Sequence, residues 1–196
     1  MSNGRPLQYD PDTALDAAMH LFWSQGYEAT SMQDLLKAMG LSKSSLYQGF
    51  GDKKALFMRC IERYRSHMSE VLAGLLHKAV SGRAFIERLL LNAAAEARQP
   101  DHLRRGCLLM NTATEFAQKD PQVAEHVTAG LEGLWTVLRA AIVRGQQEGG
   151  ISPEQNPDLL ASYFVCSIGG IKTVVKGGMP EQRVKEIVGI ALKALD

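Results

Sequence analysis

Residues 31–50, SMQDLLKAMGLSKSSLYQGF, decide the fold of the N-terminal part of this 196-residue chain. Two leucines and a methionine share one face of a first short helix, and Gly40 permits a tight turn after it. Ser42 then caps a second helix, whose Leu46 and Phe50 face inward. Two short helices that cross at a steep angle around a glycine turn form a helix-turn-helix. The segment therefore predicts that motif.

The outward face of the second helix carries small, hydrogen-bonding side chains and a single charge: Lys43, Ser44, Ser45, Tyr47 and Gln48. Side chains of this kind can enter the major groove of DNA and contact phosphates as well as base edges. A plain pair of helices in a bundle also has serines and glycines at its helix ends. Periodicity alone leaves both interpretations open.

The rest of the chain predicts an all-α fold. Apolar residues recur at intervals of three and four, as from Leu131 to Ile142, and the alternation typical of strands is almost absent. Several helices begin with a capping side chain followed by proline, as at Asp10-Pro11. Nine helices are expected, over residues 11–25, 32–39, 43–49, 53–79, 83–97, 103–117, 121–148, 157–176 and 181–195.

The helix lengths divide the chain into two domains. The first three predicted helices are short, whereas a helix over residues 53–79 would extend about 40 Å. We expect a three-helix, helix-turn-helix domain over residues 1–52. The long helix would join it to a larger helical bundle within a second domain, residues 53–196.

Composition and cysteine spacing exclude several classes of protein. The net charge is only +1, so any contact with DNA must come from a local patch rather than from a generally cationic surface. Cys60, Cys107 and Cys166 form no CxxC or Cys/His cluster, so we expect no metal site and no cofactor. No glycine-rich phosphate loop or Ser/His/Asp arrangement appears, which leaves a small all-helical enzyme as a distant alternative only.

The chain has no segment that predicts export or a membrane span. Residues 1–12, MSNGRPLQYDPD, lack the apolar region of a signal peptide. The apolar run over residues 159–171 is too short to cross a bilayer. Together with the free thiols, these features predict a cytoplasmic protein with no membrane partner.

Residues 26–57, GYEATSMQDLLKAMGLSKSSLYQGFGDKKALF, resemble the N-terminal signature of the TetR family of bacterial transcriptional repressors. The resemblance extends over residues 8–57 and rests on matches at many fixed positions. These are Gly26-Tyr27, Thr30-Ser31, residues 38–42, Leu46-Tyr47, Phe50, Lys53 and Leu56-Phe57.

The resemblance implies roles for individual residues at the DNA. Thr30 and Ser31 would hold a phosphate at a helix N-terminus. The bases would be approached by Lys43, Ser44 and Ser45, and the DNA backbone would be bound by Tyr47 and Lys53. Arg5 would serve as a minor-groove arm, or would simply be solvated. Family members often carry histidine or an aromatic residue where this chain has Gly49, so that backbone contact would be missing or moved.

The resemblance also implies a homodimer that reads a palindromic operator in double-stranded DNA. Helix 157–176 is apolar nearly all round, and with helix 181–195 it suits a four-helix dimer bundle. Burial against the same chain is the alternative. The second domain would then serve dimerisation and the binding of a small-molecule effector.

Cys107 is the candidate effector-sensing residue. Two arginines directly upstream and an early position in the predicted helix 103–117 favour its thiolate form. The run Arg105-Gly106-Cys107-Leu108, with Glu115 following, is similar to a TetR subgroup around the NemR-like and acrylate-responsive regulators, whose cysteine senses electrophiles or oxidants. A small buried hydrophobe is the alternative interpretation.

Other residues of the second domain could line an effector cavity. Asn111 and Tyr163 would be its polar anchors, although residues of these types are more often simply part of the core. Lys172 and Lys176 could approach Cys107. We therefore expect a repressor released from its operator by an electrophile or oxidant at Cys107, or alternatively by a reversible lipophilic ligand. The full set of cavity candidates is Cys107, Met110, Asn111, Phe116, Trp135, Tyr163 and Phe164.

Overall fold

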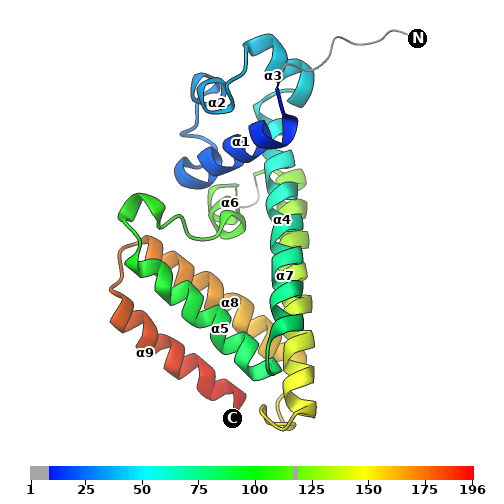
Figure 1. Cartoon of the computed structure of the whole chain (residues 1–196), viewed down its shortest axis with the longest axis vertical. Helices are drawn as coiled ribbons and strands as arrows, with labels where there is room; N and C mark the ends of the chain where they lie inside the picture. The colour runs from blue at the N-terminus through cyan, green and yellow to red at the C-terminus, as the bar shows by residue number, and fades with distance from the viewer. Residues whose placement is uncertain (1–8, 117–118) are drawn as a thin grey trace, which may run out of the picture. The chain divides into compact units, whose positions relative to one another are not determined.

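The computed structural model describes residues 9–116 and 119–196, and these contain nine α-helices and no strand. The predicted all-α fold is confirmed (Figure 1). The helices are α1 (Pro11–Gln25), α2 (Met32–Met39), α3 (Lys43–Phe50), α4 (Lys53–Lys78), α5 (Gly82–Ala95), α6 (Leu108–Phe116), α7 (Pro121–Gln147), α8 (Pro157–Lys176) and α9 (Glu181–Leu192).

The chain divides into two compact units, Met1–Tyr64 and Arg65–Asp196. The division falls inside α4, whereas the sequence placed it before residue 53. The first turns of α4 belong to the N-terminal unit because their side chains pack on α1. The rings of Phe22 and Phe57 lie 4.9 Å apart between centroids, and Arg63 donates hydrogen bonds to both Asp12 and Asp16.

The N-terminal unit owes its geometry to side-chain caps and one glycine. Ser31 caps α2 with a complete capping box, and Ser42 caps α3 by accepting the backbone N–H of Ser45. Between the two helices Gly40 has a φ of +64°, a left-handed conformation that glycine adopts without steric cost. Leu35 and Leu46, one from each helix, are fully buried. The turn therefore holds α3 in a fixed place on the unit's core.

The C-terminal unit is a helical bundle around its own hydrophobic core. Phe85, Leu138, Ile142 and Phe164 are buried there, and α5, α8 and α9 lie side by side (Figure 1). Among the described helices, α8 alone is long and apolar enough to cross a membrane by length and composition, a test that core helices also pass. Phe164 places α8 in the core of this bundle.

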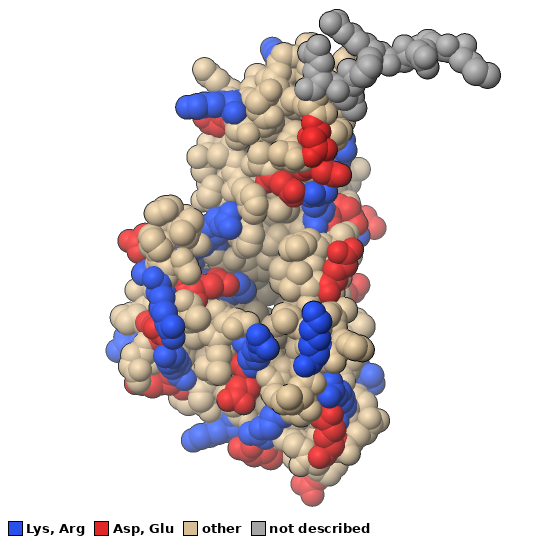
Figure 2. Space-filling model, in the orientation of Figure 1, with Lys and Arg blue, Asp and Glu red and all other residues tan. Residues whose placement is uncertain are grey.

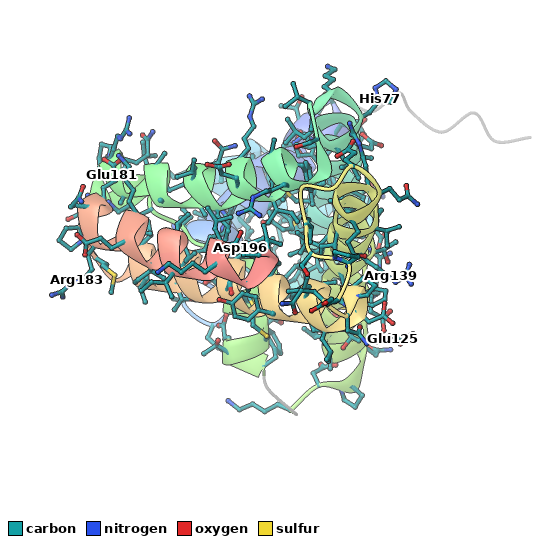
Figure 3. The ribbon with its side chains drawn as sticks, turned by 90° about the horizontal axis from the view of Figure 1, so that it is seen from below. His77, Glu125, Arg139, Glu181, Arg183 and Asp196 are labelled. Carbon is teal, nitrogen blue, oxygen red and sulfur yellow. The ribbon has the colours of Figure 1, made fainter. Side chains whose placement is uncertain are left out.

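An ion pair between Arg98 and Glu181 holds the start of α9 against the segment that follows α5. Figure 3 shows Glu181 and Arg183 at one end of this helix and Asp196 beyond the other end. Arg98 donates two hydrogen bonds of 2.7 Å to the Glu181 carboxylate, and Lys185 adds a second cation. The Arg98 hydrogen bond is the main cause that lowers the pKa of Glu181 to about 2.

The segment before α6 differs from the sequence prediction. A helix was expected from residue 103, but a short 3-10 turn ends at Leu103 and α6 begins only at Leu108. Gly106 has a φ of +72°, which a right-handed helix does not allow. The N–H of Asn111 donates to the Cys107 carbonyl at 2.9 Å, so Cys107 occupies the N-cap position instead of the first turn.

Candidate functional site

The two faces of α3 differ in polarity and burial. Lys43, Ser44, Tyr47 and Gln48 are exposed, and Ser45 is half-buried. The opposite face buries Leu46 and Phe50. Because the buried apolar face holds α3 in place on the N-terminal unit, the polar side chains of the opposite face have fixed positions from which they can contact a ligand.

The Ser42 cap also organises two of the outward-facing serines. Its Oγ accepts the N–H of Ser45 at 3.2 Å and lies 3.0 Å from the Ser44 Oγ. The Ser45 Oγ lies 2.9 Å from the same atom. One cap therefore holds both the first turn of α3 and the hydroxyls predicted to approach bases.

The N-terminus of α2 offers Ser31 but not the Thr30 side chain. Ser31 is exposed, whereas Thr30 is fully buried and its hydroxyl donates to the Gly26 carbonyl at 2.6 Å. Thr30 thus fixes the turn before α2, and its hydroxyl does not face solvent as a phosphate ligand must. The Asp34 carboxylate accepts the Ser31 hydroxyl at 2.6 Å, and this bond holds the pKa of Asp34 below its ordinary range.

The basic residues of the N-terminal unit form no continuous patch on the face that Figure 2 shows. In Figure 2, Lys and Arg are interspersed with Asp and Glu on the visible face. Lys43 is the one basic residue of α3, and the Lys53 ammonium lies 4.2 Å from the centre of the Tyr27 ring. Arg5 lies outside the described residues.

Two further residues contact the last turn of α3, and the sequence gave no reason to select them. They are Tyr9, which precedes α1, and Arg59 on α4. Neither belongs to a local motif, and both reach α3 only through tertiary packing. An aromatic residue just ahead of the α1 cap was the available signal for Tyr9.

Two of the predicted effector residues, Cys107 and Asn111, lie at Gly106 in the C-terminal unit, close to α8. A Cβ built on Gly106 would lie 3.3 Å from the Lys176 Cδ, 3.4 Å from the Asn111 Oδ1 and 3.6 Å from the Lys172 carbonyl oxygen. Asn111 also donates to the Arg105 carbonyl at 2.9 Å. Cys107, the next residue, is half-buried beside this contact between α6 and α8.

Charged neighbours of this region are engaged with partners. The Lys172 ammonium pairs with the Glu96 carboxylate. Arg104 donates to the Gln99 carbonyl at 2.7 Å and pairs with Asp101 at 3.0 Å. Arg104, one of the two upstream arginines that were expected to favour a thiolate, is therefore held by groups of its own loop.

The remaining cavity candidates are scattered over the C-terminal unit. Phe164 is fully buried in the core, and Met110 lies against Gly169 of α8. Phe116 and Trp135 are half-buried, and the Trp135 indole N–H donates to α8 at the unit's surface. Tyr163 is 41% exposed, so it lies on the outer surface and does not anchor an interior cavity of one chain.

Exposed apolar side chains are found on both of the last two helices. Leu159 on α8 is 71% exposed and Ile190 on α9 is 67% exposed. Tyr163, Cys166 and Ile187 are exposed on the same two helices. Large apolar side chains left in water on neighbouring helices are typical of a protein–protein contact.

The other cysteines contrast with Cys107. Cys60 is fully buried in the N-terminal unit, and burial raises the pKa of its thiol, so it stays protonated. Cys166 is exposed on α8. Within the described part of the chain, His, Cys, Asp and Glu nowhere gather in a group of three or more that could hold a metal ion.

Comparison with known proteins identifies the family. Residues 14–60 match the model of bacterial regulatory proteins of the tetR family, and residues 83–176 match the tetracyclin repressor-like C-terminal domain. The HTH-type transcriptional repressor ComR of Escherichia coli (strain K12) is 30% identical over 196 residues, covering 98% of this chain and 91% of ComR.

Two solved structures share the fold over nearly the whole chain. A cysteine mutant of the TetR family regulator CifR, complexed with 26-base-pair operator DNA, superposes with a TM-score of 0.85 at 29% identity, covering 98% of this chain and 100% of that one. Reduced NemR of E. coli has a TM-score of 0.83 at 17% identity, covering 95% and 97%, and shows the shared fold alone. These relatives are transcriptional regulators and not enzymes, and the chain belongs to the TetR family of transcriptional regulators.

Proposed function

We propose that this protein represses transcription by binding a palindromic operator as a homodimer, and that an electrophile acting on Cys107 releases it. The observation that carries the proposal is the polar, exposed face of α3, with Lys43, Ser44, Tyr47 and Gln48. A helix so equipped, held by a buried apolar face, can enter the major groove. Operator DNA bound to CifR, a relative of nearly the same length, supports this assignment.

Dimerisation is supported by the exposed apolar side chains of α8 and α9. Burying Leu159, Ile187 and Ile190 against a second copy removes apolar area from water, which stabilises association by about 25 cal/mol per Å². Gly170 of α8 is also exposed, and a Cβ built there would meet nothing within 4 Å, so a second backbone can approach closely. A two-fold dimer then presents two α3 helices to the two halves of a palindrome.

The release mechanism is supported by the tight surroundings of Cys107. The neighbouring Gly106 is buried, with Lys176, Asn111 and Lys172 at 3.3–3.6 Å from its Cβ position. A covalent adduct on Cys107 adds bulk at this junction, and close-packed interiors respond to added bulk by shifting. The adduct therefore favours a second packing of α6 against its neighbours, which shifts the population towards a state with low operator affinity.

The chemistry of the switch is a conjugate addition. The Cys107 thiolate sulfur forms a bond to one carbon of an activated C=C double bond, the π bond breaks, and the other carbon takes a proton from water. Nearly complete release requires that the adduct favour the low-affinity state by about 5 kcal/mol. A reversible lipophilic ligand in the same unit remains the alternative effector.

The test measures binding by fluorescence anisotropy of a labelled duplex, selected by the wild-type protein from a random-sequence library. N-ethylmaleimide is then added to the wild type, to Cys107→Ser and to Cys166→Ser. We expect release for the wild type and for Cys166→Ser, and retained binding for Cys107→Ser. Release of Cys107→Ser refutes the thiol mechanism, and saturable binding of a lipophilic compound to that variant would then select the alternative.

A further inference from the structure

The hydroxyl of Tyr9 occupies the place of a side chain on the recognition helix. A Cβ built on Gly49 would lie 2.2 Å from the Tyr9 Oη, and the next nearest atom, the Tyr9 Cζ, would be 3.6 Å away. The Tyr9 ring packs beside Phe50, with 6.3 Å between centroids. A residue from ahead of α1 thus supplies a polar aromatic group where α3 itself has only glycine.

Arg59 of α4 reaches the same turn of α3. Its Nη1 donates to the Gly49 carbonyl at 2.6 Å, and its guanidinium lies 4.6 Å from the centre of the Phe50 ring. The Gly49 carbonyl is one of the last four of α3, which have no partner inside the helix. The C-terminal end of a helix carries partial negative charge that repels anions, and the Arg59 cation offsets it.

Together these contacts bring the Tyr9 hydroxyl and the guanidinium of the exposed Arg59 to the same residue of α3, Gly49. A guanidinium has five N–H donors, of which one is used by Gly49. A hydroxyl and a guanidinium that meet at one residue can both donate hydrogen bonds to an anionic group. Phosphate groups are what DNA presents next to a groove-bound helix.

We propose that Tyr9 and Arg59 jointly bind one backbone phosphate in each operator half-site, with Gly49 leaving room for the Tyr9 hydroxyl. This inference rests on the proposed operator binding. It assigns phosphate contacts to two residues outside the helix-turn-helix. It also explains why glycine occupies position 49, where the backbone conformation does not require it.

Tyr9 would contribute a neutral hydrogen bond and Arg59 a charge, so their variants should change operator affinity and its salt dependence differently. Tyr9→Phe keeps the ring against Phe50 and removes one uncharged hydrogen-bond donor. Operator affinity should fall about tenfold or more at every salt concentration, because hydrogen bonds to charged groups are among the stronger ones. Arg59→Gln removes a charge that displaces counterions. The slope of log affinity against log salt should fall by about two for a dimer, about 0.9 for each phosphate.

Gly49→Ala tests the steric part of the proposal. The new methyl would overlap the Tyr9 Oη and displace it, so this variant should lose about as much affinity as Tyr9→Phe. In a Tyr9→Phe background the nearest remaining atom is at 3.6 Å, an ordinary contact. The double variant should therefore bind no more weakly than either single variant.

The measurement is anisotropy with the library-selected duplex between low and moderate salt, with circular dichroism to confirm folding. Arg88→Gln, on the exposed surface of α5, is the matched loss of charge and should leave the slope unchanged. Wild-type affinity in Tyr9→Phe, an unchanged slope in Arg59→Gln, or additive losses in the double variant would overturn the inference while leaving operator binding intact. If the wild type selects no duplex, operator binding fails and the phosphate contact fails with it.

Discussion

Replacing Ser42 with alanine will weaken both α3 and operator binding. The Ser42 Oγ accepts the Ser45 N–H at 3.2 Å and lies within 3.0 Å of the Ser44 hydroxyl. Loss of a serine N-cap costs about 1 kcal/mol. With eight residues, α3 is too short to stay helical without its cap and its packing. If both α3 helices of the dimer must regain this free energy when they bind, the cost is about 2 kcal/mol and operator affinity falls about thirtyfold.

The assay pairs thermal unfolding with anisotropy on the selected duplex. For a unit of this size we expect the unfolding midpoint to fall by about 4–8 °C. Ser24→Ala is the matched control, because Ser24 is exposed on α1 and its hydroxyl bonds only back to the Leu21 carbonyl of the same helix. Ser42→Asn restores a capping side chain and should recover most of both losses. Equal behaviour of Ser42→Ala and Ser24→Ala would refute the reasoning.

Three further outcomes follow from packing and charge. Gly82→Ala should lower the free energy of unfolding by about 3 kcal/mol, because the new Cβ would lie 2.0 Å from the Ala141 carbonyl oxygen. Gly74→Ala has open space around the new methyl group and should raise that free energy by about 1 kcal/mol. Denaturant titration measures both changes, and equal effects would contradict the packing argument. The pKa of Glu181 lies near 2, below its ordinary 4.5, so its ion pair stabilises the fold fully above pH 4.5 and is lost as the pH falls towards 2. The deficit in unfolding midpoint of Glu181→Gln should therefore shrink over that range, and a constant deficit would count against the ion pair. Mass spectrometry after brief treatment of the native protein with N-ethylmaleimide should find Cys107, which is half-buried, labelled and Cys60, which is fully buried, unlabelled; early labelling of Cys60 would show that its burial is transient.

Local sequence signals were sufficient for most of the helices. Proline after a capping residue marked the start of α1, α7 and α8, and the structure has these helices beginning at Pro11, Pro121 and Pro157. Caps and proline act within a few residues of their own position, so they need no knowledge of the rest of the fold. The start of α6 was misplaced because the helix expected over residues 103–117 would include Gly106, whereas Gly106 has a left-handed conformation with a φ of +72°.

The individual site residues were less accessible to sequence reasoning. Ser44 and Tyr47 were predicted on the outward face of α3, and periodicity alone gives that direction. Thr30 could not be recognised as buried, since the packing of its turn against the unit decides which way a short polar side chain points. Tyr163 was assigned to a cavity because an apolar helix has no visible outer face until its neighbours are known.

The sequence by itself determined the all-α class, the helix-turn-helix and the polar face of its second helix. These depend on the period of 3.6 residues, on caps and on one glycine turn, all of which are local. Tertiary structure decided that the N-terminal unit includes the first turns of α4 and that Cys107 lies at a helix start beside α8. It also decided that Tyr9 and Arg59 meet at Gly49. Tyr9 is 40 positions and Arg59 is 10 positions away from Gly49 in the sequence. Contacts over such separations depend on tertiary packing and produce no periodic pattern in the sequence.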